Sequence, residues 1–327
     1  MKNAMGFVLV SLLSFAATAQ PDSPLKLTRT IALPQVNGRL DHLAYDAQRH
    51  RLYVAAPANN TVEVVDVSDG KPLDPLPIND PHDLLVLSKP NLLYVTSGAD
   101  GLVKVFDCAA ERPIKTIGRL PEADNLRFDA PANRIYVAYG DGALAMINAQ
   151  TGVQTVTISL AGHPEAFAIE PLGGRIFVNL PAKRQIAVIE RLRREVIATW
   201  PLGTNAANYA LALDDANQRL FVGCRQPPRL MVLDTKSGKL VAETEIAGDV
   251  DNLFYDAQRK RLYASCGEGF IECISHSDAN HYQPLPRIAT AKGARTCLFV
   301  EESGQLFLAV PRHENRPAQI RLFQAGQ

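Results

Sequence analysis

A short hydrophobic motif recurs along this chain at a nearly constant interval, and it constrains the fold more than any other feature. Each copy has an aliphatic residue, an aromatic residue, and then a small or aliphatic residue. Successive aromatic residues are 41, 42, 41, 44, 42 and 44 positions apart. A period of this length predicts a repeat protein in which each unit packs only against its neighbours. The seven copies are Leu52-Tyr53-Val54, Leu93-Tyr94-Val95, Ile135-Tyr136-Val137, Ile176-Phe177-Val178, Leu220-Phe221-Val222, Leu262-Tyr263-Ala264 and Leu306-Phe307-Leu308.

The same order of short segments surrounds each motif. Before it lies a segment that ends near an acidic residue, such as 43–46, and after it comes an alternating segment such as 62–66. A glycine-bearing turn such as 69–71 then leads to a fourth segment, as at 195–200. Period-two alternation bounded by Gly, Asp, Asn and Pro is the pattern of half-buried strands. Four short antiparallel strands in each unit predict the blades of an all-β, seven-bladed β-propeller.

The two ends of the chain predict how the ring closes. The seventh unit has three strand-like segments, near 295–300, 305–310 and 319–323, and the chain then ends. Residues 27–33 precede the first unit and resemble the fourth strands of the other units. We therefore expect the N-terminal strand to complete the last blade, so that both faces of every blade are covered.

These units resemble the YVTN-type β-propellers, the YncE-like proteins of bacteria. That family has an aromatic-Val core, a turn, a strand ending in Asp and a glycine turn, as residues 52–70 and 220–238 do. The asparagine that follows the aromatic-Val pair in the family is kept only at Asn179, and the Trp-Asp pair of WD40 propellers is absent. The resemblance covers residues 25–325 and implies the fold. It implies no particular activity, because a fold does not carry function.

The first residues have the pattern of a bacterial signal peptide. Lys2 precedes an apolar stretch from Ala4 to Ala16, and Ala17-Thr18-Ala19 forms a small-x-small cleavage site. We expect cleavage after Ala19, a single propeller domain over 20–327, and a periplasmic or secreted location. No later segment approaches the roughly 18 apolar residues that a transmembrane helix needs.

Charge and cysteine content restrict the class of partner. Lys plus Arg and Asp plus Glu number 34 each, whereas a nucleic-acid binder normally carries a basic surplus. The five cysteines, an odd number, match no zinc or haem spacing and are expected to be small buried hydrophobes. We expect a monomer that does not bind nucleic acid. The cysteines are Cys108, Cys224, Cys266, Cys273 and Cys297.

Polar residues recur where each unit leads into its innermost strand, on the face that surrounds the mouth of the central channel. Counting back five residues from the end of each innermost strand, at Asp46, Ser88, Asp129, Glu170, Asp214, Asp256 and Glu301, selects one residue per blade. These are Asp41, Asp83, Asp124, Glu165, Tyr209, Asp251 and Thr296. Their neighbours are also functional in type: His42, His82, Asn125, Asn208, Asn252 and Arg295.

Two interpretations of these residues are open. Converging carboxylates with Asn and His suit Ca²⁺ or another divalent cation, or a cationic or hydroxyl-rich ligand. Alternatively, the same side chains accept hydrogen bonds from backbone N–H groups in the turns, as Asp and Asn commonly do. Asp41-His42 and His82-Asp83 are the most concentrated pairs, on adjacent blades. His163 is isolated in a turn and is expected to be an ordinary surface residue.

Two loops on the same face could add to the site, at 225–228 and at 311–317, the second of which contains His313. The leading hypothesis is an exported module that binds a small ligand or a protein partner over this face. The rival is a channel-mouth enzyme, such as a lactonase or a metal-assisted lyase. No Gly-x-Ser-x-Gly or His-Glu-x-x-His motif is present to support catalysis. If the chain is an enzyme, the candidate residues are Asp41, His42, His82, Asp124 and Glu165.

Overall fold

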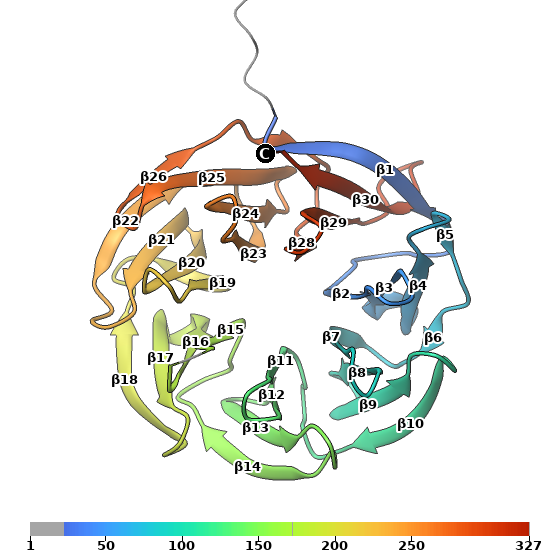
Figure 1. Cartoon of the computed structure of the whole chain (residues 1–327), viewed down its shortest axis with the longest axis horizontal. Helices are drawn as coiled ribbons and strands as arrows, with labels where there is room; N and C mark the ends of the chain where they lie inside the picture. The colour runs from blue at the N-terminus through green and yellow to red at the C-terminus, as the bar shows by residue number, and fades with distance from the viewer. Residues whose placement is uncertain (1–22, 172, 327) are drawn as a thin grey trace, which may run out of the picture.

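The computed structural model is a closed ring of seven antiparallel β-sheets around a common axis (Figure 1). It describes residues 23–326 with the exception of Leu172. The predicted signal peptide therefore lies outside the described residues. Seven sheets in a ring confirm the all-β, seven-bladed propeller.

Blades 1 to 6 are continuous in sequence and take their strands in chain order from the ring axis outward. Blade 1 contains β2 (Leu43–Asp46), β3 (Arg51–Ala56), β4 (Thr61–Asp66), β5 (Lys71–Pro72) and β6 (Leu76–Pro77). Blade 2 contains β7 (Pro81–Leu87), β8 (Leu92–Ser97), β9 (Leu102–Asp107) and β10 (Arg112–Ile117). Blade 3 contains β11 (Leu126–Asp129), β12 (Arg134–Tyr139), β13 (Ala143–Asn148) and β14 (Gln154–Ser159). Blade 4 contains β15 (Phe167–Ile169), β16 (Arg175–Leu180), β17 (Gln185–Glu190) and β18 (Glu195–Pro201).

Blades 5 and 6 follow the same order, and blade 7 ends the chain. Blade 5 contains β19 (Ala206–Asp214), β20 (Arg219–Gln226), β21 (Pro228–Asp234) and β22 (Leu240–Glu245). Blade 6 contains β23 (Val250–Asp256), β24 (Arg261–Cys266), β25 (Phe270–Asp278), β26 (His281–Pro284) and β27 (Ile288–Ala289). Blade 7 contains β28 (Thr296–Val300), β29 (Gln305–Val310) and β30 (Ala318–Ala325). Two short 3₁₀ helices, η1 (Pro57–Asn59) and η2 (Pro181–Lys183), join the second and third strands of blades 1 and 4.

The N-terminal strand β1 (Leu25–Leu33) is the outer strand of blade 7, as predicted. It pairs antiparallel with β30 from Leu25 opposite Ala325 to Leu33 opposite Ala318 (Figure 1). Arg29 on β1 also donates hydrogen bonds to the carbonyls of Val67 and Ser68, in blade 1. The first strand therefore both completes the last blade and ties it to the first.

The hydrophobic core lies between the blades. Each of seven clusters of buried side chains draws its members from two adjacent blades. The aromatic residue of every motif is buried, with at most 2 % of its surface exposed. The five cysteines are also buried and unpaired, which confirms that they pack as small hydrophobes. A blade removed from the ring would expose both of its faces.

The outer strands of blades 1 and 6 depart from the regular pattern. In each blade two short strands replace the fourth one, so that β5 and β6 both pair with β4, and β26 and β27 both pair with β25. Prolines interrupt both segments, at Pro72, Pro75 and Pro77 and at Pro284 and Pro286. Because proline has no backbone N–H to donate, it interrupts the hydrogen bonding of a strand. It is tolerated here because these are edge strands.

Candidate functional site

The pairing register identifies one equivalent residue per blade at the mouth of the ring. In each blade, one residue at the end of the innermost strand lies opposite the first residue of the next strand. Examples are Asp46 opposite Arg51 and Asp129 opposite Arg134. In blade 4 it is Glu170, which follows the last paired residue and donates its N–H to the carbonyl of Arg175. Five residues before this position lies the residue that faces the mouth. We call this set the mouth ring: Asp41, His82, Asp124, Glu165, Tyr209, Asp251 and Arg295.

The register corrects the sequence-based count in two blades. The innermost strands of blades 2 and 7 end their pairing at Leu87 and Val300, one residue before Ser88 and Glu301. His82 and Arg295 therefore belong to the mouth ring. Asp83 and Thr296 lie one position deeper, in a second ring. The second ring is His42, Asp83, Asn125, Ala166, Ala210, Asn252 and Thr296.

The second ring joins neighbouring blades. Asp83 Oδ2 accepts a hydrogen bond from the backbone N–H of Leu126 at 2.8 Å and forms an ion pair with Arg127 at 2.8 Å. Asn252 Oδ1 accepts a hydrogen bond from the N–H of Cys297, in the next blade, at 2.9 Å. Both side chains accept hydrogen bonds from backbone N–H groups, as the second interpretation predicted. Asp83 Oδ1 accepts one from Leu84 in its own blade, but both residues also bond the backbone of the next blade.

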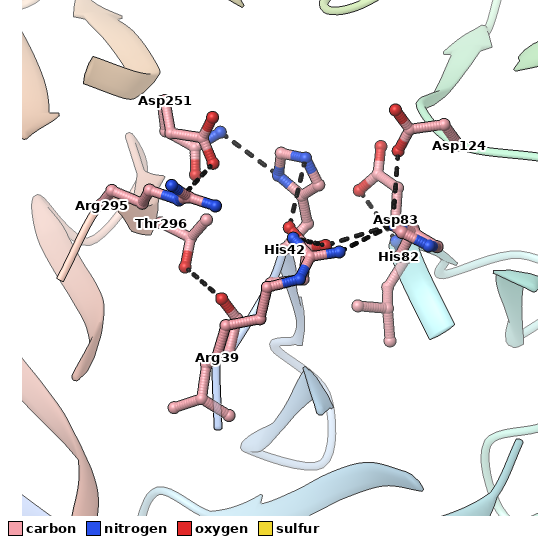
Figure 2. Close-up of polar contacts among 12 residues, drawn as sticks. Arg39, His42, His82, Asp83, Asp124, Asp251, Arg295 and Thr296 are labelled. Atoms are coloured by element: carbon pink, nitrogen blue, oxygen red, sulfur yellow. Dashed lines mark hydrogen bonds and ion pairs between the residues drawn. The ribbon is translucent and has the colours of Figure 1, made fainter. Parts of the chain in front are cut away.

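On the side of blades 6 and 7, the acidic residues of the mouth are paired with arginine. Asp251 forms ion pairs with Arg225 and with Arg295, whose Nε lies 3.6 Å from it (Figure 2). Burial raises the pKa of Asp251, although both arginines act in the opposite direction. The Arg225 guanidinium also covers the ring of Tyr209, 3.9 Å from its centroid. In this part of the mouth ring, the carboxylate of Asp251 is therefore neutralised by arginine side chains.

Asp41 and His82 form a second paired group, on blades 1 and 2. Asp41 contacts Arg39 at 2.8 Å and His82 Nδ1 at 3.2 Å. Burial would raise the pKa of Asp41, but the hydrogen bond from His82 helps to lower it overall. Burial likewise disfavours charge on His82, yet Asp41 and Asp124 raise its pKa to about 9. His82 Nε2 lies 3.2 Å from Asp80, so the imidazolium bridges two carboxylates.

His42 lies between the two paired groups (Figure 2). Its Nδ1 is 3.2 Å from the Asn252 amide nitrogen, and its Nε2 is 3.9 Å from Asp41. Because the oxygen of Asn252 is held by Cys297, the amide donates to His42 and favours the neutral imidazole. Burial also lowers the pKa of His42, but the surrounding carboxylates, Asp83 first, raise it overall. Because burial and the carboxylates act on the pKa of His42 in opposite directions, a charge added at the mouth would change the protonation of His42.

The side of blades 3 and 4 is different, because its carboxylates are not paired with arginine or lysine. Within the described chain, neither Asp124 nor Glu165 accepts a hydrogen bond through its side chain, and the nearest basic side chains are histidines. Asp124 lies 3.9 Å from His82 Nδ1, and Glu165 lies 4.0 Å from His163 Nε2. Burial first and Asp124 second raise the pKa of Glu165 to about 8. Burial also raises the pKa of Asp124. These two carboxylates are free to take a ligand.

His163 is a functional candidate that the sequence analysis missed. Its ligand atom and those of Asp124 and Glu165 all lie within 4.8 Å of one another. Residues 163 and 165 are two positions apart in the sequence, a spacing that could have linked them. Asp124 joins this pair only because blade 3 packs against blade 4, which the spacing within one repeat does not reveal.

The remaining predicted residues lie deeper in the ring or outside it. Asn125 is 2 % exposed, and its Oδ1 has no hydrogen-bond partner. His313 contacts Glu314 at 3.9 Å and the backbone of Arg316, and no hydrogen bond or ion pair joins it to the mouth ring. The 311–317 loop instead lines a hollow of its own together with Thr290 and Lys292.

The opposite face carries a hollow of its own. It has a volume of about 1070 Å³ and is lined by Tyr45, His50, Ser88 and Glu302, among others. These side chains belong to the far ends of the inner strands and to their turns, so the hollow is separate from the mouth ring.

Across residues 23–326, apart from 172, no helix is long and apolar enough to cross a membrane.

Comparison with known proteins shows the fold alone. No family model matches this chain, and no curated protein matches it. A chain of the crystal structure of the mitotic checkpoint complex superposes with a TM-score of 0.79 at 14% sequence identity, covering 100% of this chain and 99% of that one. A chain of Kuenenia stuttgartiensis hydrazine synthase superposes with a TM-score of 0.74 at 15% identity, covering 84% of this chain and 94% of that one. At these identities, the likeness confirms the propeller and leaves the function to the site.

Proposed function

We propose that this chain is an exported β-propeller that works as a binding module, holding a ligand over its mouth ring. The observation that carries the proposal is the asymmetry of that ring. Asp251 is matched by two arginines, whereas Asp124 and Glu165 receive neither an arginine nor a lysine from the described chain. Partly buried carboxylates without a partner are costly, and a positively charged group relieves that cost. The site therefore favours a small ligand with a cationic group.

Two further features support this assignment. The seven repeats resemble those of YVTN-type propellers, and residues 1–19 have the pattern of a signal peptide, which favours the periplasm or secretion. One structural neighbour comes from a multi-protein complex, so a protein that presents a lysine or an N-terminus to the mouth ring is a second kind of occupant. Both occupants require the same free carboxylates.

The alternative is a channel-mouth enzyme of the lactonase or metal-assisted lyase type. The observation in its favour is His42, which lies among carboxylates that oppose its neutral form. A histidine balanced in this way can act as a general acid or base. The alternative predicts turnover, for example hydrolysis of δ-valerolactone that is lost in His42→Ala. A binding module predicts no turnover.

The test of the binding proposal is calorimetry with small cations on protein freed of metal by EDTA. Spermidine, choline and glucosamine are suitable probes, because they differ in charge and in hydroxyl content. We expect at least one to bind, and to lose about tenfold or more in affinity in the double variant Asp124→Asn/Glu165→Gln.

Matched variants locate the binding. Glu195→Gln removes an exposed carboxylate from the outer strand of blade 4 and should leave the affinity unchanged. Glu302→Gln alters the hollow on the opposite face and should also have no effect. Binding that survives the double variant, or that is lost only in Glu302→Gln, contradicts the proposal.

A further inference from the structure

The free side of the mouth ring contains a histidine whose ring is oriented by the backbone. His163 Nδ1 lies 2.8 Å from the carbonyl oxygen of Gly140. Because a carbonyl can only accept a hydrogen bond, Nδ1 carries the proton. The other nitrogen, Nε2, faces Glu165 at 4.0 Å. Histidines that bind metal ions are commonly held in this way, with the second nitrogen bonded to a carbonyl or carboxylate.

Three acceptor groups converge at this point. A ring nitrogen of His163 and one carboxylate oxygen each from Asp124 and Glu165 all lie within 4.8 Å of one another. No backbone N–H, arginine or lysine of the described chain donates a hydrogen bond to either carboxylate side chain. A second proton on His163 would neutralise one carboxylate, whereas a divalent cation would neutralise both.

We propose that Asp124, His163 and Glu165 form a binding site for a divalent transition-metal ion, such as Zn²⁺ or Mn²⁺. The proposal rests on the binding function assigned above to the mouth ring, and it places a metal ion on the same carboxylates that an organic cation would need. One imidazole nitrogen and two carboxylates are a donor set for these ions, whereas Ca²⁺ and Mg²⁺ prefer oxygen ligands throughout. Ca²⁺, which the sequence pattern suggested, is therefore not the expected occupant.

The cluster has to contract slightly around such an ion. With bonds of about 2.0–2.2 Å, the ligand atoms of a tetrahedral site lie roughly 3.4 Å apart. The 4.0 Å between His163 Nε2 and Glu165 Oε1 is longer, and a small movement of these partly exposed side chains closes the difference. The side chains of Asp124, His163 and Glu165 are 19%, 36% and 22% exposed, so the ion can enter from the mouth. Three protein ligands leave positions open for water or for an anionic group of a bound molecule.

The site can be tested by titrating the EDTA-treated full chain with Zn²⁺, Mn²⁺ and Ca²⁺ in separate calorimetry experiments. Co²⁺ serves as a spectroscopic probe, because its visible absorption reports nitrogen and oxygen coordination. We expect one Zn²⁺ per chain, no Ca²⁺ binding at the same concentrations, and a loss of about tenfold to a hundredfold in Zn²⁺ affinity in His163→Ala. His163→Gln and a thermal melt of each variant verify that the loss does not come from unfolding.

A matched control is His281→Ala, which removes an exposed histidine that also contacts a carboxylate, Asp278, at 2.8 Å. Its Zn²⁺ affinity should equal that of the unaltered chain. Absence of Zn²⁺ and Mn²⁺ binding overturns the proposal, as does Zn²⁺ binding that is equal in His163→Ala. Equal affinity for Ca²⁺ overturns the assignment to transition metals.

The outcomes are separable from those of the binding proposal. If spermidine or another organic cation binds the metal-free chain through Asp124 and Glu165 but Zn²⁺ does not, only the metal site fails. If neither binds, both proposals fail. The variant His163→Ala should weaken Zn²⁺ alone, because an organic cation needs the carboxylates and not the imidazole.

Discussion

Asp83 in blade 2 accepts a hydrogen bond from the backbone N–H of Leu126 in blade 3 at 2.8 Å. Asn252 does the same from blade 6, toward Cys297 in blade 7. A polar side chain that comes directly before the innermost paired segment thus reaches across to the next blade. These contacts replace part of what apolar packing supplies elsewhere between blades.

The first prediction concerns this contact. Asp83→Ala should destabilise the chain by about 2–4 kcal/mol, because it leaves the buried N–H of Leu126 without an acceptor and Arg127 without its ion pair. Asp83→Asn keeps an acceptor and should lose less. Urea unfolding followed by far-ultraviolet circular dichroism measures both. An Asp83→Ala curve that overlays that of the unaltered chain would show that the contact contributes nothing.

The second prediction concerns ring closure. A chain that starts at residue 34 lacks β1 and should melt at a much lower temperature, because it no longer buries Leu25, Ile31 and Leu33. At about 1.5–3 kcal/mol for each buried side chain, the loss is roughly 5 kcal/mol or more. The matched control starts at Ser23 and keeps β1. Equal melting temperatures for the two chains would contradict the closure.

The third prediction concerns acid stability. Four aspartates at the ends of third strands, namely Asp66, Asp107, Asp234 and Asp278, have lowered pKa values. In three of them, a backbone N–H of the following turn is the largest influence. For Asp234, burial is the largest single influence and raises the pKa, but hydrogen bonds and the ion pair together outweigh it. The largest of the lowering influences is the hydrogen bond from the Ser237 hydroxyl.

Because these pKa values are lower in the folded state than in the unfolded chain, the carboxylates stabilise the fold above about pH 4. The contribution should be lost as the pH falls through the folded pKa values. Replacing all four with Asn should flatten the dependence of the urea midpoint on pH between pH 5 and 2. Blade 3 already has Asn148 at this position, where its Oδ1 accepts the same turn hydrogen bonds. An unchanged slope in the fourfold variant would contradict the assignment.

The fourth prediction concerns the cysteines. Burial raises the pKa of Cys108 to about 11 and that of Cys224, Cys273 and Cys297 to about 12, and it also raises the pKa of Cys266. The reactive form is the thiolate, so the folded chain should not react with Ellman's reagent at pH 8. All five thiols should react in guanidinium. A thiol that reacts rapidly in the folded chain would show that its blade opens locally.

Most of the fold could be predicted from the sequence because each blade depends on a local pattern of residues that repeats along the chain. Each motif specifies one buried strand, and seven copies at a fixed interval specify the ring. The missing strand of the last unit and the extra one before the first predicted how β1 closes blade 7. The split outer strands of blades 1 and 6 were not predicted, although their prolines are visible in the sequence.

The candidate site was only partly predictable. The sequence placed Asp41, Asp124, Glu165 and Asp251 at the mouth, because each lies at a constant distance from an acidic strand end. In blades 2 and 7 the strand ends are Leu87 and Val300, so counting from the polar residue beside each gave a position one too late. Successive side chains of a strand point to opposite faces, so an error of one position assigns a side chain the wrong direction.

By itself, then, the sequence determined the number of blades, their order, the closure by the N-terminal strand and the face on which polar side chains gather. These follow from local periodicity, which each unit expresses without reference to the others. Only the tertiary structure decided which charges meet. It joined Asp251 to Arg225 and Arg295, and it left Asp124 and Glu165 beside His163. The physical reason is that ion pairing across the mouth depends on how neighbouring blades are packed, which no single repeat encodes.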